Sequence, residues 1–293
     1  MTCFKLVVIL LPTVAAFFAP SQRNDFSTKL FSAPPEAALK FQGGPPLPPP
    51  PPGPIIGDKD PMLLWDICGE NEKLIQGQSL KTWSYPSPNV EKVQVSMKTD
   101  GRPLAAKIDL WHGPDYTATT TKIYTEDGAT RPYNGIQATP KGMNTVGLYN
   151  TGNMEFPYST IVEGDPGKGN LINFCAELSE GGPGKLVQGG AIASFPFPAN
   201  VESVAVMMKT DGRNLKCHVE LLQGPNNNKQ VVEYYASDGY KRPFFTLIKS
   251  PGSGNVVRIT NQNTVEFPFY AWVVPYEINE DFSPYDPVIT NGR

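Results

Sequence analysis

The chain has 293 residues, of which 40% are hydrophobic, and a formal net charge of only −3. Its acidic and basic residues are interspersed, which argues against a nucleic-acid-binding protein, because such proteins usually carry a basic stripe. The 31 Pro and 27 Gly, together with 12 Tyr and 15 Phe, favour an all-β fold with many turns.

The first 40 residues have the pattern of a targeting sequence in two parts. Residues 1–16 carry one basic residue, an apolar run and small residues before Ala16, which predicts a signal peptide. The apolar run is short for a membrane span, so we expect no stable membrane insertion. Residues 17–40 are rich in hydroxyl groups and poor in acids, which predicts a transit peptide. The combination resembles the bipartite plastid presequence of diatoms and related algae; plain secretion is the alternative.

Two further segments lack the pattern of a folded core. Residues 41–60 are rich in Gly and Pro, which predicts an extended linker that acts as a stiff tether or as a docking peptide. The C-terminal tail, residues 277–293, is polar and has no periodicity. It is predicted to be disordered, with an extended arm that adds to a neighbour as the alternative.

Between these segments, apolar residues alternate with polar ones. The alternation over residues 93–97 and 204–208 predicts half-buried strands. The dipeptides Asp100-Gly101 and Asp211-Gly212 follow, and they predict tight hairpins leading to strands at 105–111 and 216–222. Short helical turns are expected near 63–66 or 174–178. Further strands are predicted at 122–124, 231–236, 244–248, 256–259 and 270–274.

The chain repeats itself at a constant offset of 111 residues. Lys98 to Arg102 returns as Lys209 to Arg213, and Glu155-Phe156-Pro157 returns as Glu266-Phe267-Pro268. Such self-similarity predicts related units. We therefore predict two tandem homologous β-sandwich domains, jelly-roll-like and related by internal duplication, over residues 61–166 and 167–276.

The cysteines are sparse. Apart from Cys3 in the signal, the chain holds Cys68, Cys175 and Cys217, an odd set that does not form a disulfide framework. Cys68 and Cys175 precede the two repeats, and we interpret them as buried thiols rather than as a bridge.

Nothing in the sequence has the spacing of a catalytic or metal site. His112 and His218 are not equivalent in the repeat and lie in no metal-ligand pattern, and no nucleophile elbow or phosphate loop occurs. We therefore predict that the protein is not an enzyme and has no catalytic, cofactor-binding or metal site.

Eight charged residues recur in both repeats and are candidate turn or interface residues. The Asp-Gly aspartates suit turns, and the arginines directly after them are candidates for binding an anion or a sugar hydroxyl, or are solvated charges. The glutamates before Phe-Pro are candidates for ion pairs with the arginines of the two Arg-Pro dipeptides. The eight are Asp100, Arg102, Arg131, Glu155, Asp211, Arg213, Arg242 and Glu266.

A duplicated β-domain without catalytic residues suits two functions. Similar surfaces at two positions favour open arrays, because head-to-tail contacts that do not close propagate and sheet edges accept further strands. The same duplication suits a bivalent carbohydrate-binding, lectin-like protein. Aromatic residues that stack on sugars or pack in the core are Trp83, Tyr85, Phe195 and Phe197.

The presequence, the Pro-rich lead and the two copies of Met-Lys-Thr-Asp-Gly-Arg, at 97–102 and 208–213, resemble the diatom pyrenoid shell proteins over residues 61–276. The resemblance implies a structural protein that self-assembles into a sheet or shell around the Rubisco-rich pyrenoid and supports CO2 concentration and carbon fixation. It implies the plastid stroma, at the pyrenoid periphery, as the location. The main expected partner is the chain itself; Rubisco and other pyrenoid proteins are further candidate partners, and no nucleic acid is expected.

Overall fold

The computed structural model describes residues 64–87, 89–113, 116–140, 142–164, 177–178, 184–224 and 227–279. The predicted signal peptide, transit peptide and Pro-rich linker lie outside these residues, as do Cys175 and most of the tail. No helix in the described ranges has the length and apolar character needed to cross a membrane.

The described chain is built almost entirely of strands. It begins with the short helix α1 (Leu64–Cys68) and the 3-10 turn η1 (Gly69–Asn71). The strands of the first half are β1 (Lys73–Ile75), β2 (Leu80–Tyr85), β3 (Lys92–Lys98), β4 (Leu104–His112), β5 (Thr117–Thr125), β6 (Tyr133–Ala138), β7 (Asn144–Asn150) and β8 (Tyr158–Gly164). Those of the second half are β9 (Lys185–Val187), β10 (Ile192–Pro196), β11 (Val201–Lys209), β12 (Leu215–Gln223), β13 (Asn228–Ala236), β14 (Phe244–Lys249), β15 (Asn255–Asn261) and β16 (Phe269–Ile278).

These strands form two eight-stranded sheets. Sheet A has the order β1-β8-β3-β6-β14-β11-β16-β9, and sheet B has the order β10-β15-β12-β13-β5-β4-β7-β2. Every neighbouring pair is antiparallel. The predicted all-β sandwich is therefore confirmed, and all the strands expected from the alternating pattern are present.

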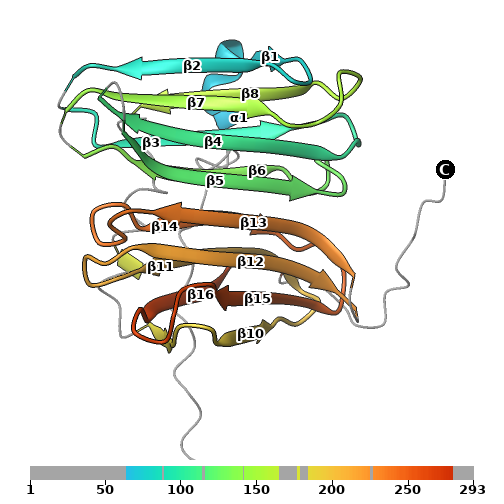
Figure 1. The fold of residues 1–293 in the computed structure, drawn as a ribbon. Coiled ribbons are helices and arrows are strands. Elements are labelled where there is room, and N and C mark those ends of the chain that lie inside the picture. Colours follow the sequence, from blue (N-terminus) through green and yellow to red (C-terminus); the bar gives the residue numbers. More distant parts are fainter. Residues whose placement is uncertain are drawn as a thin grey trace, which may run out of the picture. The chain divides into compact units, whose positions relative to one another are not determined.

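The two sequence halves are joined strand to strand, four strands from each half in each sheet (Figure 1). In sheet B, β5 pairs with β13, and the central pair is Lys122 opposite Glu233. In sheet A, β6 pairs with β14, and the central pair is Gly135 opposite Thr246. The two residues of each central pair are 111 positions apart in the sequence, so each lies opposite its own counterpart in the other half. The register is therefore symmetric about each central pair. The halves thus meet as the two copies of an isologous dimer do; the duplication itself and the division at residue 166 stay predictions.

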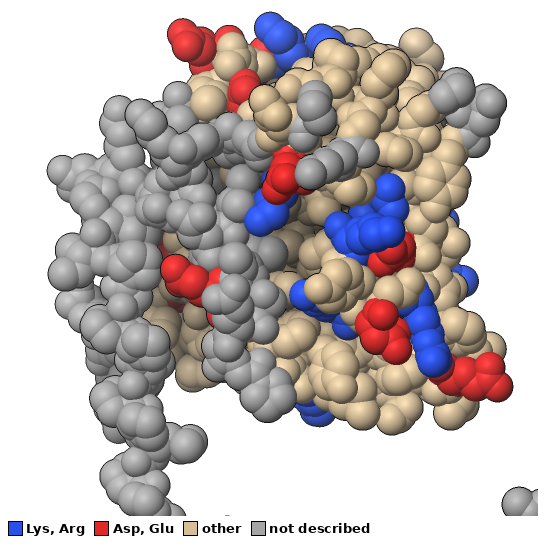
Figure 2. All heavy atoms as spheres, turned by 90° about the vertical axis from the view of Figure 1, so that its left-hand side faces the viewer, with Lys and Arg blue, Asp and Glu red and all other residues tan. Residues whose placement is uncertain are grey.

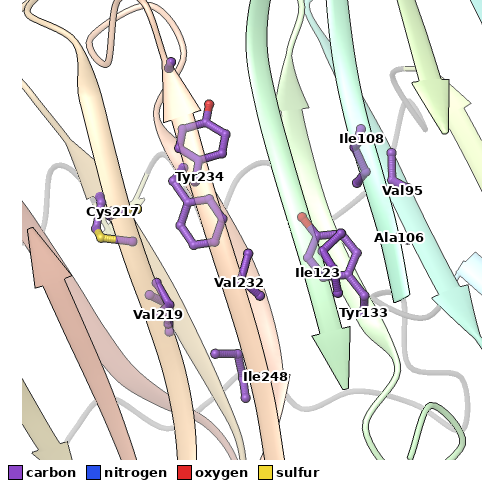
Figure 3. Close-up of a cluster of buried hydrophobic side chains, with 14 of the residues drawn as sticks. Val95, Ala106, Ile108, Ile123, Tyr133, Cys217, Val219, Val232, Tyr234 and Ile248 are labelled. Atoms are coloured by element: carbon purple, nitrogen blue, oxygen red, sulfur yellow. The ribbon is translucent and has the colours of Figure 1, made fainter. Parts of the chain in front are cut away.

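One hydrophobic core fills the space between the sheets and runs through both halves (Figure 3). Val95 and Tyr133 of the first half and Cys217 and Tyr234 of the second belong to the same buried cluster. Burial raises the pKa of the Cys217 thiol well above its usual range. Such a thiol is inert and behaves as a small apolar side chain. Cys68 is also a free thiol, at the end of α1.

The central strands β3 and β11 of sheet A are buried on both faces, so the prediction that residues 93–97 and 204–208 form half-buried strands was wrong. The polar residues of β3 that alternate with the core valines are covered: Gln94 is 1% and Ser96 0% exposed. The Ser96 hydroxyl donates to Asn134 Oδ1 at 2.7 Å, which satisfies a buried polar group. In the second half the corresponding face is apolar, and Met207, Phe245 and Leu247 form a second buried cluster there.

The Asp-Gly turns do not close hairpins, so the prediction of tight hairpins at these two dipeptides was wrong. β3 pairs with β6 and β8 in sheet A, whereas β4 pairs with β5 and β7 in sheet B. The turn at Asp100-Gly101 therefore carries the chain from one sheet to the other across the core. Gly101 has φ of +80° and Gly212 has φ of +111°, so the glycines are still needed for conformational reasons. Core-facing residues of the two strands, such as Val95 and Ile108, are buried between the sheets in the same cluster.

Candidate functional site

The repeated Lys-Thr-Asp-Gly-Arg segments form the same turn in each half. The Thr99 hydroxyl donates to the Arg102 carbonyl at 2.5 Å, and the Thr210 hydroxyl donates to the Arg213 carbonyl at 2.7 Å. Asp100 and Asp211 are exposed at the tips of these turns. The repeated threonine thus closes the turn. In the second half, Asp211 also lies 3.6 Å from Arg213 Nε.

The arginines of these turns hold the Glu-Phe-Pro segments through main-chain contacts. Arg102 Nη1 donates to the Glu155 carbonyl at 2.9 Å, and Arg213 Nη1 donates to the Glu266 carbonyl. The glutamate side chains point to solvent and are exposed. Across the described ranges no ion pair joins either glutamate to Arg131 or Arg242 within the chain; a pairing between copies stays a prediction.

Arg131 and Arg242 are instead buried, each only 7% exposed. Arg131 Nη2 donates to Gln223 Oε1, 3.1 Å away on β12, so it links the first half to the second. Burial lowers the pKa of Arg131, while the nearby Asp127 and Glu126 carboxylates partly oppose the shift. The Arg242 carbonyl accepts a hydrogen bond from the buried Tyr234 hydroxyl. Arg131 thus links the two halves through its side chain, whereas Arg242 contributes a main-chain carbonyl.

Two buried asparagines, which sequence reasoning did not single out as site residues, tie each end of the molecule together. Asn150 Nδ2 donates to the Ile75 carbonyl of β1 at 3.1 Å and to the Phe156 carbonyl at 2.9 Å. Asn261 makes the corresponding bonds to the carbonyls of Val187 on β9 and of Phe267. The 111-residue offset that relates the two asparagines was the available signal.

The two ends of the sandwich carry open sheet edges. β1 and β2 form one end, and β9 and β10 form the opposite end (Figure 1). Each of these strands has a partner on one side only within the described sheets. Unpaired backbone donors and acceptors at such edges can accept a further strand. Apolar side chains are exposed beside them: Leu74, Leu80 and Met154 at one end, and Leu186, Ile192 and Val265 at the other.

The outer face of sheet B is a mixed charged surface. His218 lies between two carboxylates, 3.5 Å from Glu220 and 3.7 Å from Glu233. Glu220 also accepts a 2.6 Å bond from Arg258, and Glu233 pairs with Lys122 across the join at 3.2 Å. Among the described residues, no group of three His, Cys, Asp or Glu side chains is placed to hold a metal ion. Acidic and basic side chains also alternate over the face seen in Figure 2.

The four aromatic candidates are all partly buried and packed against the core. Trp83 and Phe195 are half-buried and pack against the core from the edge strands. Each has a lysine over its ring: Lys81 Nζ is 6.0 Å from the Trp83 centroid, and Lys185 Nζ is 5.0 Å from the Phe195 centroid. Tyr85 and Phe197 pack against the same core. None of the four is a free stacking platform.

A family comparison identifies the chain. The model of the diatom pyrenoid shell protein family matches residues 65–275. The chain belongs to this family. The match spans both halves of the sandwich and confirms the resemblance noted in the repeated motifs. The family's description is that of a shell protein of the pyrenoid, a compartment of the plastid.

The other comparisons add little. Procruciferin, an 11S globulin from Brassica napus, is 10% identical, with 70% of this chain and 77% of that chain covered and a TM-score of 0.19. The vicilin from Solanum melongena is 9% identical, with 69% and 74% covered and a TM-score of 0.19. Scores this low carry no argument about fold or function. No curated protein matches the chain.

We predict that Asn150→Ala lowers the free energy of unfolding by about 2 kcal/mol, because it leaves buried carbonyls without donors. Asn153→Ala, which removes an exposed amide in the same loop, is the matched control and should change stability by less than about 0.5 kcal/mol. Urea unfolding followed by circular dichroism measures both. If Asn150→Ala were as stable as the unmodified chain, the buried Asn150 amide would not stabilise the edge strand.

A second prediction concerns pH. The hydrogen bond from Arg258 lowers the pKa of Glu220, so its contribution to stability is present above the unfolded-state pKa and is lost as pH falls through the folded-state pKa. Glu220→Gln should cost about 1–2 kcal/mol at pH 7. The difference from the unmodified chain should shrink below about pH 4.

The control is Glu233→Gln, because Glu233 is 43% exposed and its pair with Lys122 is screened by solvent. It should cost less than about 0.5 kcal/mol. Urea unfolding between pH 3 and pH 7 compares the three proteins. If the difference in unfolding free energy between Glu220→Gln and the unmodified chain were the same at every pH, a lowered pKa of Glu220 would be contradicted.

Proposed function

We propose that this protein is a structural, non-enzymatic component of a protein sheet or shell that encloses the Rubisco-rich pyrenoid. The observation that carries the proposal is the family match over residues 65–275, which includes nearly all of the described sandwich. The location follows from the family and from the predicted bipartite presequence: the plastid stroma, at the periphery of the pyrenoid. A continuous protein layer there would limit CO2 leakage, maintain pyrenoid shape and so support CO2 concentration and carbon fixation.

The architecture supports a self-assembling role. Strand pairing joins the two halves into one unit with a continuous, closely packed core. Such a unit holds its two ends at a fixed distance and orientation, as a repeating array requires. Its open edges lie at opposite ends, which allows contacts that repeat without closing. The main partner is a further copy of the chain; Rubisco and other pyrenoid proteins are additional candidates.

Electron microscopy of the purified chain tests this proposal. Over a range of protein and salt concentrations, the chain should form extended sheets or tubes without any other component. The contacts should each bury more than about 1,000 Å² if the array is stable. Dispersed single particles under all conditions would contradict self-assembly.

A bivalent carbohydrate-binding function is the second candidate, and one observation favours it. Tyr124 and Tyr235 are 111 residues apart, lie on the outer face of sheet B, and are 47% and 41% exposed. A shallow depression beside Tyr124 is lined by Ala105 and Glu233, among others. Exposed aromatic rings at equivalent positions are what two sugar-stacking sites require.

A glycan array separates the two functions. If the protein is a lectin, it should bind a defined glycan, and Tyr124→Ala should lose at least half of the signal because one of two sites is removed. Tyr116→Ala, which changes an exposed tyrosine outside the strands, should leave binding intact. Absence of binding to every glycan would eliminate this candidate.

A further inference from the structure

We propose that copies of this chain dock head to tail through their sheet edges, with β2 of one copy adding to β10 of the next and continuing sheet B. This inference rests on the proposed self-assembly and specifies the surface that assembly uses. The occupant of each open edge is the opposite edge of a second copy.

The strand count makes such a junction geometrically possible. Each sheet has eight strands, and all neighbours are antiparallel, so its first and last strands run in opposite directions. A copy displaced along the sheet therefore presents β10 antiparallel to β2, and β9 antiparallel to β1. The junction repeats the type of contact that already joins β5 to β13 inside the chain. β2 has six residues and β10 has five, which is an ordinary strand length.

The exposed apolar side chains are concentrated at these ends. Eight large aliphatic or methionine side chains are exposed in the described residues, and six of them lie at the two ends. At the first end, the turn between β1 and β2 packs on the loop that carries Met154: a Cβ on Gly77 would lie 2.6 Å from Met154 Cα. At the other end, a Cβ on Gly189 would lie 2.7 Å from the Val265 nitrogen. At each end, the edge strands and the neighbouring loop thus form one continuous surface.

Head-to-tail docking is favoured over docking of like ends. β2 carries Lys81, so two copies of β2 would bring like charges close together, which is unfavourable. β10 ends in Pro196, which has no backbone N–H, so two copies of β10 would form a ladder that lacks donors at both of its ends. β10 has no charged residue and β2 has no proline. Pairing the two different strands avoids the like-charge contact and leaves only one end of the ladder without a donor.

The lysines at the edges do not exclude docking. Proteins often use edge lysines to keep sheets apart, and Lys73, Lys81 and Lys185 lie on the edge strands. Lys81 and Lys185, however, place their ammonium groups over the Trp83 and Phe195 rings of the same end. In the β2–β10 junction Lys81 also meets a strand without charged residues, so no like charge opposes it there.

Assembly-blocking variants test the inference. Leu80 is 53% and Ile192 63% exposed, so Leu80→Glu and Ile192→Glu should fold normally. Each should raise the concentration needed for assembly at least tenfold, because a charge replaces apolar contact area at the junction. In head-to-tail docking every junction needs both ends, so each variant alone stays monomeric. An equimolar mixture forms a heterodimer through the two intact ends, which sedimentation velocity detects.

The matched control is Tyr240→Glu. Tyr240 is 59% exposed and lies in the turn between β13 and β14, which are central strands of the two sheets and not edge strands. It should assemble as the unmodified chain does, whereas Met154→Glu should impair assembly in the same way as Leu80→Glu. Circular dichroism and thermal melting confirm that all variants keep the fold.

Three outcomes overturn the inference. If the unmodified chain does not assemble, the proposed self-assembly fails and the docking inference fails with it. If the unmodified chain and both edge variants assemble equally, self-assembly holds and the edge docking is wrong. If each variant alone forms a homodimer, docking of like ends replaces the head-to-tail arrangement.

Discussion

The pairing of β5 with β13 and of β6 with β14 is the contact on which the rest of the structure depends. It converts two sets of four strands per sheet into continuous eight-stranded sheets, and it lets one core run through both halves. In each central pair, a residue lies opposite its counterpart 111 positions along the chain, so the strand register is symmetric about that pair. Because this pairing covers one edge of each half, the remaining edges lie only at the two far ends.

The sequence predicted β3, β4 and β5 and the strands from β11 to β16, but it missed β2, β6, β7, β8 and β10, and it predicted the connections less well. Period-two alternation identified the core strands, because side chains of alternate residues face opposite sides of a strand. The Asp-Gly dipeptides were read as hairpin turns, although β3 and β4 belong to different sheets. Local turn chemistry fixes a positive φ at Gly101 but does not decide which strands pair; burial across the core does. The short edge strands β1 and β9, with three residues each, carry too little periodicity to be recognised.

The candidate residues show a similar limit. The repeat correctly located residues with equivalent contacts in both halves, yet their roles emerged only from the structure. Arg102 and Arg213 bind the main-chain carbonyls of Glu155 and Glu266, and Arg131 and Arg242 are buried near the join. The exposed leucine and isoleucine at the edges had no sequence signal, since an apolar residue in a strand is normally expected to face the core.

This division of roles bears on how the protein can assemble. The polar groups repeated in both halves are largely engaged within the fold: the turn threonines and arginines bond main-chain carbonyls, and Asn150 and Asn261 fasten the edge strands. A contact between copies must then use other groups, and the unpaired backbone and exposed apolar side chains of the ends are available. The asparagines contribute indirectly, because an edge strand that is held rigid loses less conformational entropy when another strand adds to it. The same internal fastening that stabilises each end thus prepares it to bind a further copy.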